Sequence, residues 1–212
     1  MIRKLVSAST SVLLALLFLI SLAHQSGAAE VTFYFEGTTT QAGDLPTACG
    51  GFVPSGSSIS GSITLETTIP DLHPAPQQSI HPGAIVASSL QIGSNGFNHA
   101  SDGSLQFQDQ YNVTGDCGGA LHDQLNFSPS VSGVSCSATF NVSIVGIDCT
   151  GTMFNSAANI PTTPPAPIYL PFDFTMTPSR GGETLVGSIT SLSLEPPVAV
   201  ESATWGRLKN LN

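Results

Sequence analysis

Basic residues are almost missing from this chain. Its 212 residues include five lysines and arginines against 14 aspartates and glutamates, and none of the five lies between Lys4 and Arg180. Proteins that bind nucleic acid do so largely by neutralising phosphates with basic side chains. The scarcity therefore excludes nucleic acid as a partner and disfavours phosphorylated substrates and anionic membrane surfaces. Neutral molecules and cations remain as partners.

The first 29 residues have the pattern of a signal peptide. Arg3 and Lys4 precede an apolar run over residues 12–22, and the small residues 26–29 then form a cleavage site. The run is too short to span a bilayer comfortably, and a retained N-terminal anchor helix is the alternative. Residues 1–29 are therefore expected to be removed on export. The mature chain then has three basic residues against 14 acidic ones, a net charge of −11.

Helical periodicity is absent between Val31 and Pro196. Apolar and polar residues alternate instead, which is typical of half-buried β-strands separated by Gly, Pro, Asn and Ser turns. The alternation predicts about eight strands, residues 31–36, 58–66, 86–92, 105–111, 121–127, 138–144, 168–176 and 183–195, with a short segment around Phe97 between the third and the fourth.

These strands predict one all-β domain over residues 30–196, followed by a C-terminal tail, residues 197–212. The expected architecture is a single antiparallel β-sandwich, jelly-roll-like or immunoglobulin-like, with a closed barrel as the alternative. The spacing of true immunoglobulin domains is missing because the only tryptophan is Trp205. Pro171 predicts an edge position for its strand. A switch of apolar parity at Val145 predicts a bulge there. The apolar parity of the last strand also shifts between Ile189 and Leu192.

Four cysteines follow the predicted cleavage site: Cys49, Cys117, Cys136 and Cys149. An even number of cysteines in an exported chain favours two disulfides, and three pairings are possible. A zinc site is the rival interpretation, but no Cys-x-x-Cys pair is present to support it.

Sequence motifs for catalysis are missing as well. There is no Gly-x-Ser-x-Gly elbow, no His-Glu-x-x-His and no phosphate-binding glycine loop. Four histidines follow the leader: His73, His81, His99 and His122. His73 and His81 lie in a proline-rich segment, residues 72–82, that is expected to be a solvated loop. No catalytic residue and no bound cofactor is therefore predicted.

Calcium and neutral sugars are the two ligands that the residues permit. Asp102 and Asp116 lie in Gly-rich and Ser-rich segments where carboxylate and carbonyl oxygens could meet a calcium ion, although neither segment matches an EF-hand. An aspartate in such a turn more often caps its own backbone. Tyr34, Tyr111 and Tyr169 are the rings that could offer a platform to a neutral sugar.

Two stretches resemble a known family. They are Gly61-Ser62-Ile63-Thr64-Leu65-Glu66-Thr67-Thr68-Ile69-Pro70-Asp71 and Leu185-Val186-Gly187-Ser188-Ile189-Thr190-Ser191-Leu192-Ser193-Leu194-Glu195-Pro196, which share the tetrapeptide Gly-Ser-Ile-Thr. They resemble the strand motifs of bacterial exported proteins of the PEP-CTERM class. That class ends in a Pro-Glu-Pro box, a hydrophobic helix and a basic cluster. Here the Pro-Glu-Pro is missing, and the last six residues are too short and polar for such a helix.

The resemblance implies export to a bacterial cell surface or matrix and carries no catalytic residues. Together with the composition, it predicts a secreted or surface-associated, non-enzymatic protein with a structural or adhesive role in the cell envelope or extracellular matrix. Neutral polysaccharide and other envelope proteins are the expected partners, and no membrane span is expected in the mature chain. The alternative function is a secreted carbohydrate-binding module or an enzyme acting on polysaccharide.

Overall fold

The structure, a computed structural model, describes residues 29–73, 77–111, 117, 121–154, 159–180 and 182–196. Most of the expected leader and all of the expected tail lie outside these ranges. The strands are β1 (Glu30–Thr39), β2 (Gly43–Asp44), β3 (Phe52–Val53), β4 (Ser58–Glu66), β5 (Gln78–Ile92), β6 (Asn95–Tyr111), β7 (His122–Gly133), β8 (Thr139–Asp148), β9 (Phe172–Pro178) and β10 (Leu185–Ser193). Two short 3-10 helices, η1 (Thr47–Cys49) and η2 (Pro167–Tyr169), accompany them.

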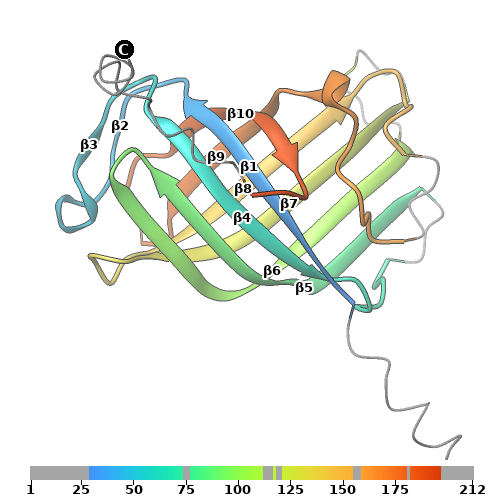
Figure 1. Cartoon of the computed structure of the whole chain (residues 1–212), viewed down its shortest axis with the longest axis horizontal. Helices are drawn as coiled ribbons and strands as arrows, with labels where there is room; N and C mark the ends of the chain where they lie inside the picture. Colours follow the sequence, from blue (N-terminus) through green and yellow to red (C-terminus); the bar gives the residue numbers. More distant parts are fainter. Residues whose placement is uncertain are drawn as a thin grey trace, which may run out of the picture.

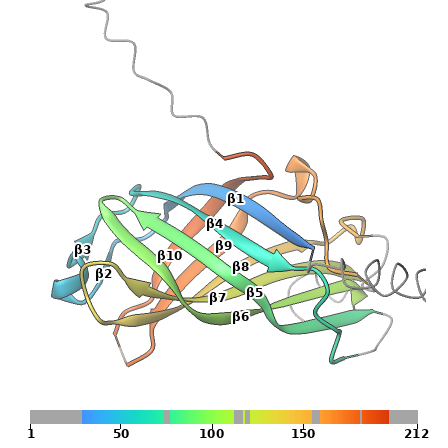
Figure 2. The same ribbon diagram turned by 60° about the horizontal axis from the view of Figure 1, so that its bottom comes forward.

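Eight of these strands close into an antiparallel barrel in the order β1-β10-β9-β8-β7-β6-β5-β4 (Figures 1 and 2). The prediction of a β-sandwich is therefore wrong, and the closed barrel is the architecture found. Closure depends on β1, which is hydrogen-bonded to β4 on one side and to β10 on the other. A sandwich and a barrel both bury alternate residues, so the period of two does not distinguish them.

The two Gly-Ser-Ile-Thr motifs lie on either side of β1. The first belongs to β4 and the second to β10, so segments from opposite ends of the domain become neighbours of the same strand. Gly61 faces inward at a crowded point, where an added Cβ atom would lie 2.2 Å from the carbonyl oxygen of Ser89 and 2.5 Å from the Phe35 ring. The motif thus makes room for a core phenylalanine.

The barrel interior is filled by side chains. The inward-facing residues are mainly Phe, Ile and Leu, and ring pairs such as Phe33 with Phe127 and Phe97 with Phe140 have centroids 5.9 and 5.3 Å apart. Eight strands enclose a space only just wide enough for side chains or one small ligand. Here the phenylalanines occupy it: Phe33, Phe35, Phe97, Phe107, Phe127, Phe140, Phe172 and Phe174.

Several predicted details change with closure. The bulge expected at Val145 is absent, because β8 pairs without a register shift on both sides and Val145 and Ile147 are half-buried outward residues. The parity shift in the last strand corresponds to a bulge, since Thr190 is the extra residue where β10 pairs with Glu36 and Gly37. Pro171 does not mark an edge strand, because β9 begins after it and pairs with β8 and β10.

The two ends of the barrel carry different features. The terminal end, where β1 begins and β10 ends, also holds the end of β8 and the disulfide Cys117–Cys149. The hairpin end holds the β2–β3 hairpin and the disulfide Cys49–Cys136. The prediction of two disulfides is confirmed, and the structure selects one of the three pairings. Among the described residues, no helix is long and hydrophobic enough to cross a bilayer.

Candidate functional site

Polar side chains point into the barrel at its terminal end. Asp109, Asp123 and Asp148, here called the aspartate row, occupy inward-facing positions on the adjacent strands β6, β7 and β8. Asp123 lies directly opposite Asp148 in the β7–β8 pairing. Like charges placed directly opposite destabilise a sheet, so each carboxylate needs hydrogen bonds or a proton to offset the repulsion.

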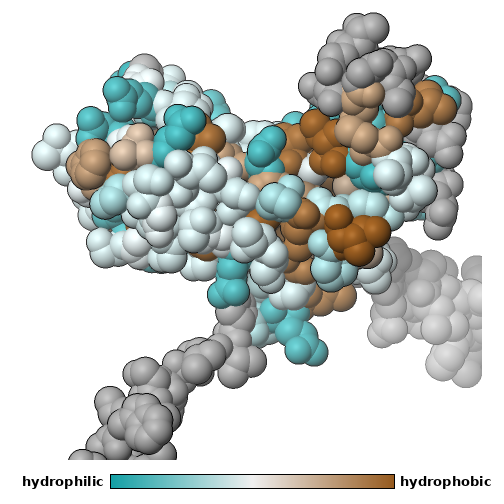
Figure 3. All heavy atoms as spheres, turned by 90° about the horizontal axis from the view of Figure 1, so that it is seen from above, coloured by the Kyte–Doolittle hydropathy of each residue, from teal (hydrophilic) through white to brown (hydrophobic). Residues whose placement is uncertain are grey.

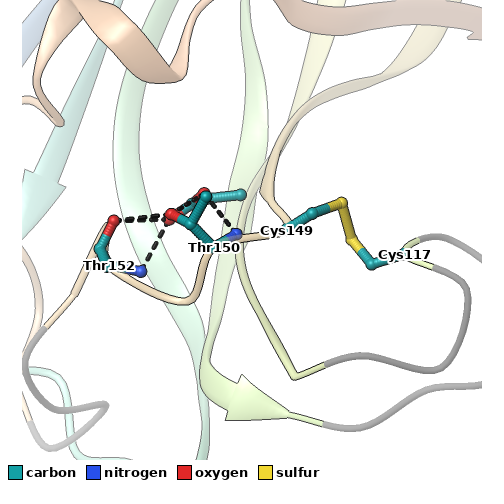
Figure 4. The surroundings of a disulfide bond; sticks show 5 residues. Cys117, Cys149, Thr150 and Thr152 are labelled. Carbon is teal, nitrogen blue, oxygen red and sulfur yellow. Dashed lines mark hydrogen bonds between the residues drawn. A yellow bond between two sulfur atoms is a disulfide. The ribbon is translucent and has the colours of Figure 1, made fainter.

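Asp148 obtains this compensation from the turn that follows β8. Its Oδ1 accepts hydrogen bonds from the backbone nitrogen and hydroxyl of Thr150, at 2.8 and 2.6 Å, and its Oδ2 accepts two from Thr152, at 2.7 and 3.2 Å (Figure 4). Burial alone would raise the pKa of Asp148, but these hydrogen bonds outweigh it and hold the pKa below its ordinary value. The turn carrying the Cys117–Cys149 disulfide is thereby fastened to the end of the barrel.

Asp123 and Asp109 are stabilised differently. Asp123 is fully buried and accepts a hydrogen bond of 2.8 Å from the backbone nitrogen of Phe154. Asp109 has one oxygen, Oδ1, without a hydrogen-bond partner among the described residues. Burial, with the neighbouring charge of Asp123, raises the pKa of Asp109 above its ordinary value. Protonation of Asp109 as the pH falls would remove part of the charge of the aspartate row.

A second polar group lies beside the row on β5. His81 Nδ1 donates a hydrogen bond of 2.8 Å to the carbonyl oxygen of Ile69, while its Nε2 is hydrogen-bonded to the Ser79 hydroxyl. Its ring stacks on Phe107. The expectation that His81 lies in a solvated loop is wrong, because β5 begins at Gln78 and carries His81 into the core.

The Ser79–His81 pair has the hydrogen-bond connectivity of a nucleophile and its base, but a substrate could not reach it. Ser79 is 0% exposed, so no substrate reaches it unless the barrel end opens. Asp71 closes this end by accepting backbone hydrogen bonds from His73 and Ile80, at 2.8 and 2.9 Å. Burial opposes ionisation of Asp71, but these bonds, Ser79 and His81 together lower its pKa. The group is a structural one.

Two buried polar residues were not predicted from the sequence. Gln108 precedes Asp109 in the chain, and His122 precedes Asp123. Each therefore lies on the opposite parity of its strand, β6 or β7, from the aspartate that follows it. Within the part of the chain that the structure describes, Gln108 Oε1 and both ring nitrogens of His122 are buried without a hydrogen-bond partner. Buried unpaired groups of this kind are commonly satisfied by ordered water. The sequence signal for buried polar groups in this region was that Asp109 and Asp123 fall on the apolar parity of the predicted strands 105–111 and 121–127.

The structure describes only one of the two predicted calcium ligands. Asp102 lies on β6 with its side chain 69% exposed, 3.5 Å from His99 Nε2, and Asp116 lies outside the described residues. Within the described ranges, no three His, Cys, Asp or Glu side chains converge as a metal would need. Three tyrosines were proposed as platforms for a sugar. Tyr169 is hydrogen-bonded to Thr152, and Tyr34 is half-buried. The side chain of Tyr111 is not among those that the structure describes.

Changing Asp148 to asparagine is expected to lower the free energy of unfolding by about 2–3 kcal/mol at pH 7, because an amide cannot accept all four hydrogen bonds. The folded pKa of Asp148 is lowered, so its contribution is full above the unfolded pKa and is lost as the pH falls through the folded pKa. Urea unfolding at pH 7 and pH 3 should show the difference from the native chain shrinking in acid.

Asp109→Asn is the matched control, and its expected change in the free energy of unfolding has the opposite sign. The folded state binds the Asp109 proton more tightly than the unfolded state, so that contribution is full below the unfolded pKa and is lost as the pH rises through the folded pKa. The Asp109 variant is thus expected to gain stability relative to the native chain at pH 7. Equal losses in both variants at pH 7 would contradict the roles given to the two carboxylates.

The resemblance to PEP-CTERM proteins rests on the two motifs that form β4 and β10. The tail that would carry a sorting signal lies outside the described residues. No family model, no curated protein and no solved structure matches the chain.

Proposed function

We propose that this chain is a secreted or surface-associated protein with a structural or adhesive, non-enzymatic role in a bacterial cell envelope or extracellular matrix. The observation that carries the proposal is the outer face of the barrel, here called the outer wall. Its outward positions hold hydroxyl and amide side chains on every barrel strand: Thr32, Thr38, Ser60, Ser62, Thr64, Ser89, Gln91, Asn98, Gln106, Asn126, Ser130, Asn141, Ser143, Thr175, Thr177, Ser188 and Thr190.

Most outward positions of the outer wall are polar but uncharged, and some of them are hydrogen-bonded across neighbouring strands. Thr32 bonds to Thr64 at 2.9 Å and Ser62 to Ser89 at 2.8 Å. Pale, weakly polar side chains cover much of the face in Figure 3, with hydrophobic ones between them. A few exposed carboxylates also lie on the outer wall: Glu36, Asp102 and Asp173. Such a surface offers hydrogen-bond donors and acceptors to neutral polymers or proteins.

Other features of the structure are those expected of a protein that stays folded outside the cell. The closed sheet has no unpaired edge to aggregate, and the filled core needs no ligand. The two disulfides are compatible with an extracellular location. The motifs of β4 and β10 add the resemblance to exported PEP-CTERM proteins. These points support a stable protein with a structural or adhesive role.

Three surface pockets formed by described residues favour this role over an enzyme acting on polysaccharide. Such an enzyme would need carboxylates and aromatic rings in one cleft. A shallow depression of about 390 Å³ on the outer wall contains Asp102 but no aromatic ring. A second, of about 270 Å³, contains Phe97 but no carboxylate. A third, of about 290 Å³, contains Arg180 and neither a carboxylate nor an aromatic ring.

Fractionation of cells that produce the full chain tests the proposal. The expected result is a chain whose N-terminus lies near Glu30, with its cysteines oxidised, in the surface or matrix fraction. Removing residues 197–212 then shows whether the tail holds the protein there. A full-length chain with reduced cysteines in the cytoplasm would contradict export. Turnover of polysaccharide by the purified mature chain would contradict the non-enzymatic role.

A further inference from the structure

A pocket of about 290 Å³ opens at the hairpin end of the barrel, on the opposite end from the aspartate row. Arg180 lines it, together with the hydroxyl residues Ser137, Thr139 and Ser179 and the rings of Pro46 and Pro178. We propose that this pocket, here called the Arg180 pocket, binds the carboxylate of a hydroxylated ligand, namely a sugar acid.

The walls of the pocket come from three distant segments that are fastened together. The Cys49–Cys136 disulfide joins η1, which Pro46 precedes, to the turn that carries Ser137. The backbone nitrogen of Ser179 donates a hydrogen bond of 2.9 Å to the carbonyl oxygen of Thr139, which holds the third segment against the second. The pocket therefore exists before any ligand arrives, which lowers the entropy cost of binding.

Charge gives the pocket its selectivity. Arg180 is the one lysine or arginine among the described residues. No carboxylate of those residues lies within 4.0 Å of its guanidinium, although the chain has 14 acidic groups. The aspartate row lies at the other end of the barrel, where salt screens its effect on this pocket. The guanidinium is thus free to pair with an anion from outside.

The shape and lining distinguish between anions. A guanidinium presents parallel donors that match a carboxylate in a two-bond arrangement. The protein's net negative charge disfavours a dianionic phosphate more than a singly charged carboxylate. The three hydroxyl residues can bond to ligand hydroxyls, while the proline rings and Ala138 offer apolar surface to C–H groups. A single sugar ring bearing a carboxylate combines all these features.

Titration of the oxidised mature chain with glucuronate and with glucose tests the inference, because the two sugars differ only at the carboxylate. Binding is followed by chemical-shift changes in NMR spectra. Glucuronate is expected to bind saturably, at least tenfold more tightly than glucose, and more weakly as salt is added. Polygalacturonate and free galacturonate then show whether the carboxylate comes from a polymer or from a monosaccharide.

Three variants separate the role of Arg180 from general effects. Arg180→Gln is expected to weaken glucuronate binding at least tenfold, and Arg180→Lys to give an intermediate loss because it keeps the charge but not the paired donors. Glu183→Gln, in the same turn, is the control and should not weaken binding. Because Arg180 is exposed, all three variants should keep the native melting temperature.

The inference is overturned if glucuronate and glucose bind equally, if neither binds, or if Arg180→Gln binds glucuronate as the native chain does. A different result would also overturn it: self-association that Arg180→Gln abolishes, without sugar binding, would assign the pocket to a carboxylate of a second copy. The envelope role proposed above does not require this pocket, so either role can fail alone.

Discussion

Phe127→Ala is expected to lower the free energy of unfolding by about 3–5 kcal/mol. Phe127 is 2% exposed, and its ring centroid lies 5.9 Å from that of Phe33 on the other side of the barrel interior. Strands on both sides of the resulting cavity belong to one closed, hydrogen-bonded wall, which cannot collapse inward as loops can. Most of the cavity therefore remains, and the cost lies in the upper range for such substitutions. Urea unfolding of the oxidised chain measures it.

Phe52→Ala is the matched control, because Phe52 is 64% exposed on β3. Its loss should change the free energy of unfolding by no more than about 0.5 kcal/mol. If Phe127→Ala does not fold, Phe127→Leu provides the measurement, with an expected loss of about 1–2 kcal/mol. Similar losses at positions 52 and 127 would show that the barrel interior is not the packed core described above.

Replacing Cys49 and Cys136 together by alanine is expected to cost about 4 kcal/mol, because their disulfide closes a loop over 87 residues and restricts the unfolded chain. The variant should melt at a lower temperature than the native chain under oxidising conditions. Under reducing conditions the two should become similar. Thermal unfolding with and without reductant makes the comparison.

Cys117 and Cys149, replaced together, serve as the control for loop length. Their disulfide spans 32 residues, so its loss should cost somewhat less, about 3–4 kcal/mol. Only the first variant should also weaken glucuronate binding, because Cys49–Cys136 supports the Arg180 pocket and Cys117–Cys149 lies at the other end. Weakened binding in both variants would show that the disulfide acts on the pocket through overall stability.

The sequence predicted the local structure well where one face of a strand is uniformly apolar. β4 has the predicted bounds, 58–66, because Ile59, Ile63 and Leu65 alternate without interruption. β5 was predicted to begin too late, because Pro82 was interpreted as part of a loop over residues 72–82, whereas the structure accommodates it at a register shift between His81 and Ile85. A proline is read as a strand end from sequence, but it can occupy an irregular position inside a long strand.

The candidate sites depend on contacts between distant segments and were largely missed. The aspartate row joins three strands, and the sequence indicated only that Asp109 and Asp123 share the apolar parity of their strands. The Arg180 pocket joins residues near positions 46, 138 and 179, and none of them forms a motif. Side chains that meet across a barrel leave no spacing pattern along the chain, so only Arg180's isolation as a basic residue was visible beforehand.

The sequence by itself determined that the domain is built of β-strands, which face of most strands is buried, and that its cysteines are paired. Those properties follow from neighbours one or two positions apart and from the count of cysteines. Only the tertiary structure decided that the sheet closes, which cysteines join, and where Asp109, Asp123 and Arg180 lie. Closure requires β1 to pair with both β4 and β10. Alternation shows which residues turn inward but not which strand lies alongside, because strand pairing joins backbone groups that nearly every residue possesses.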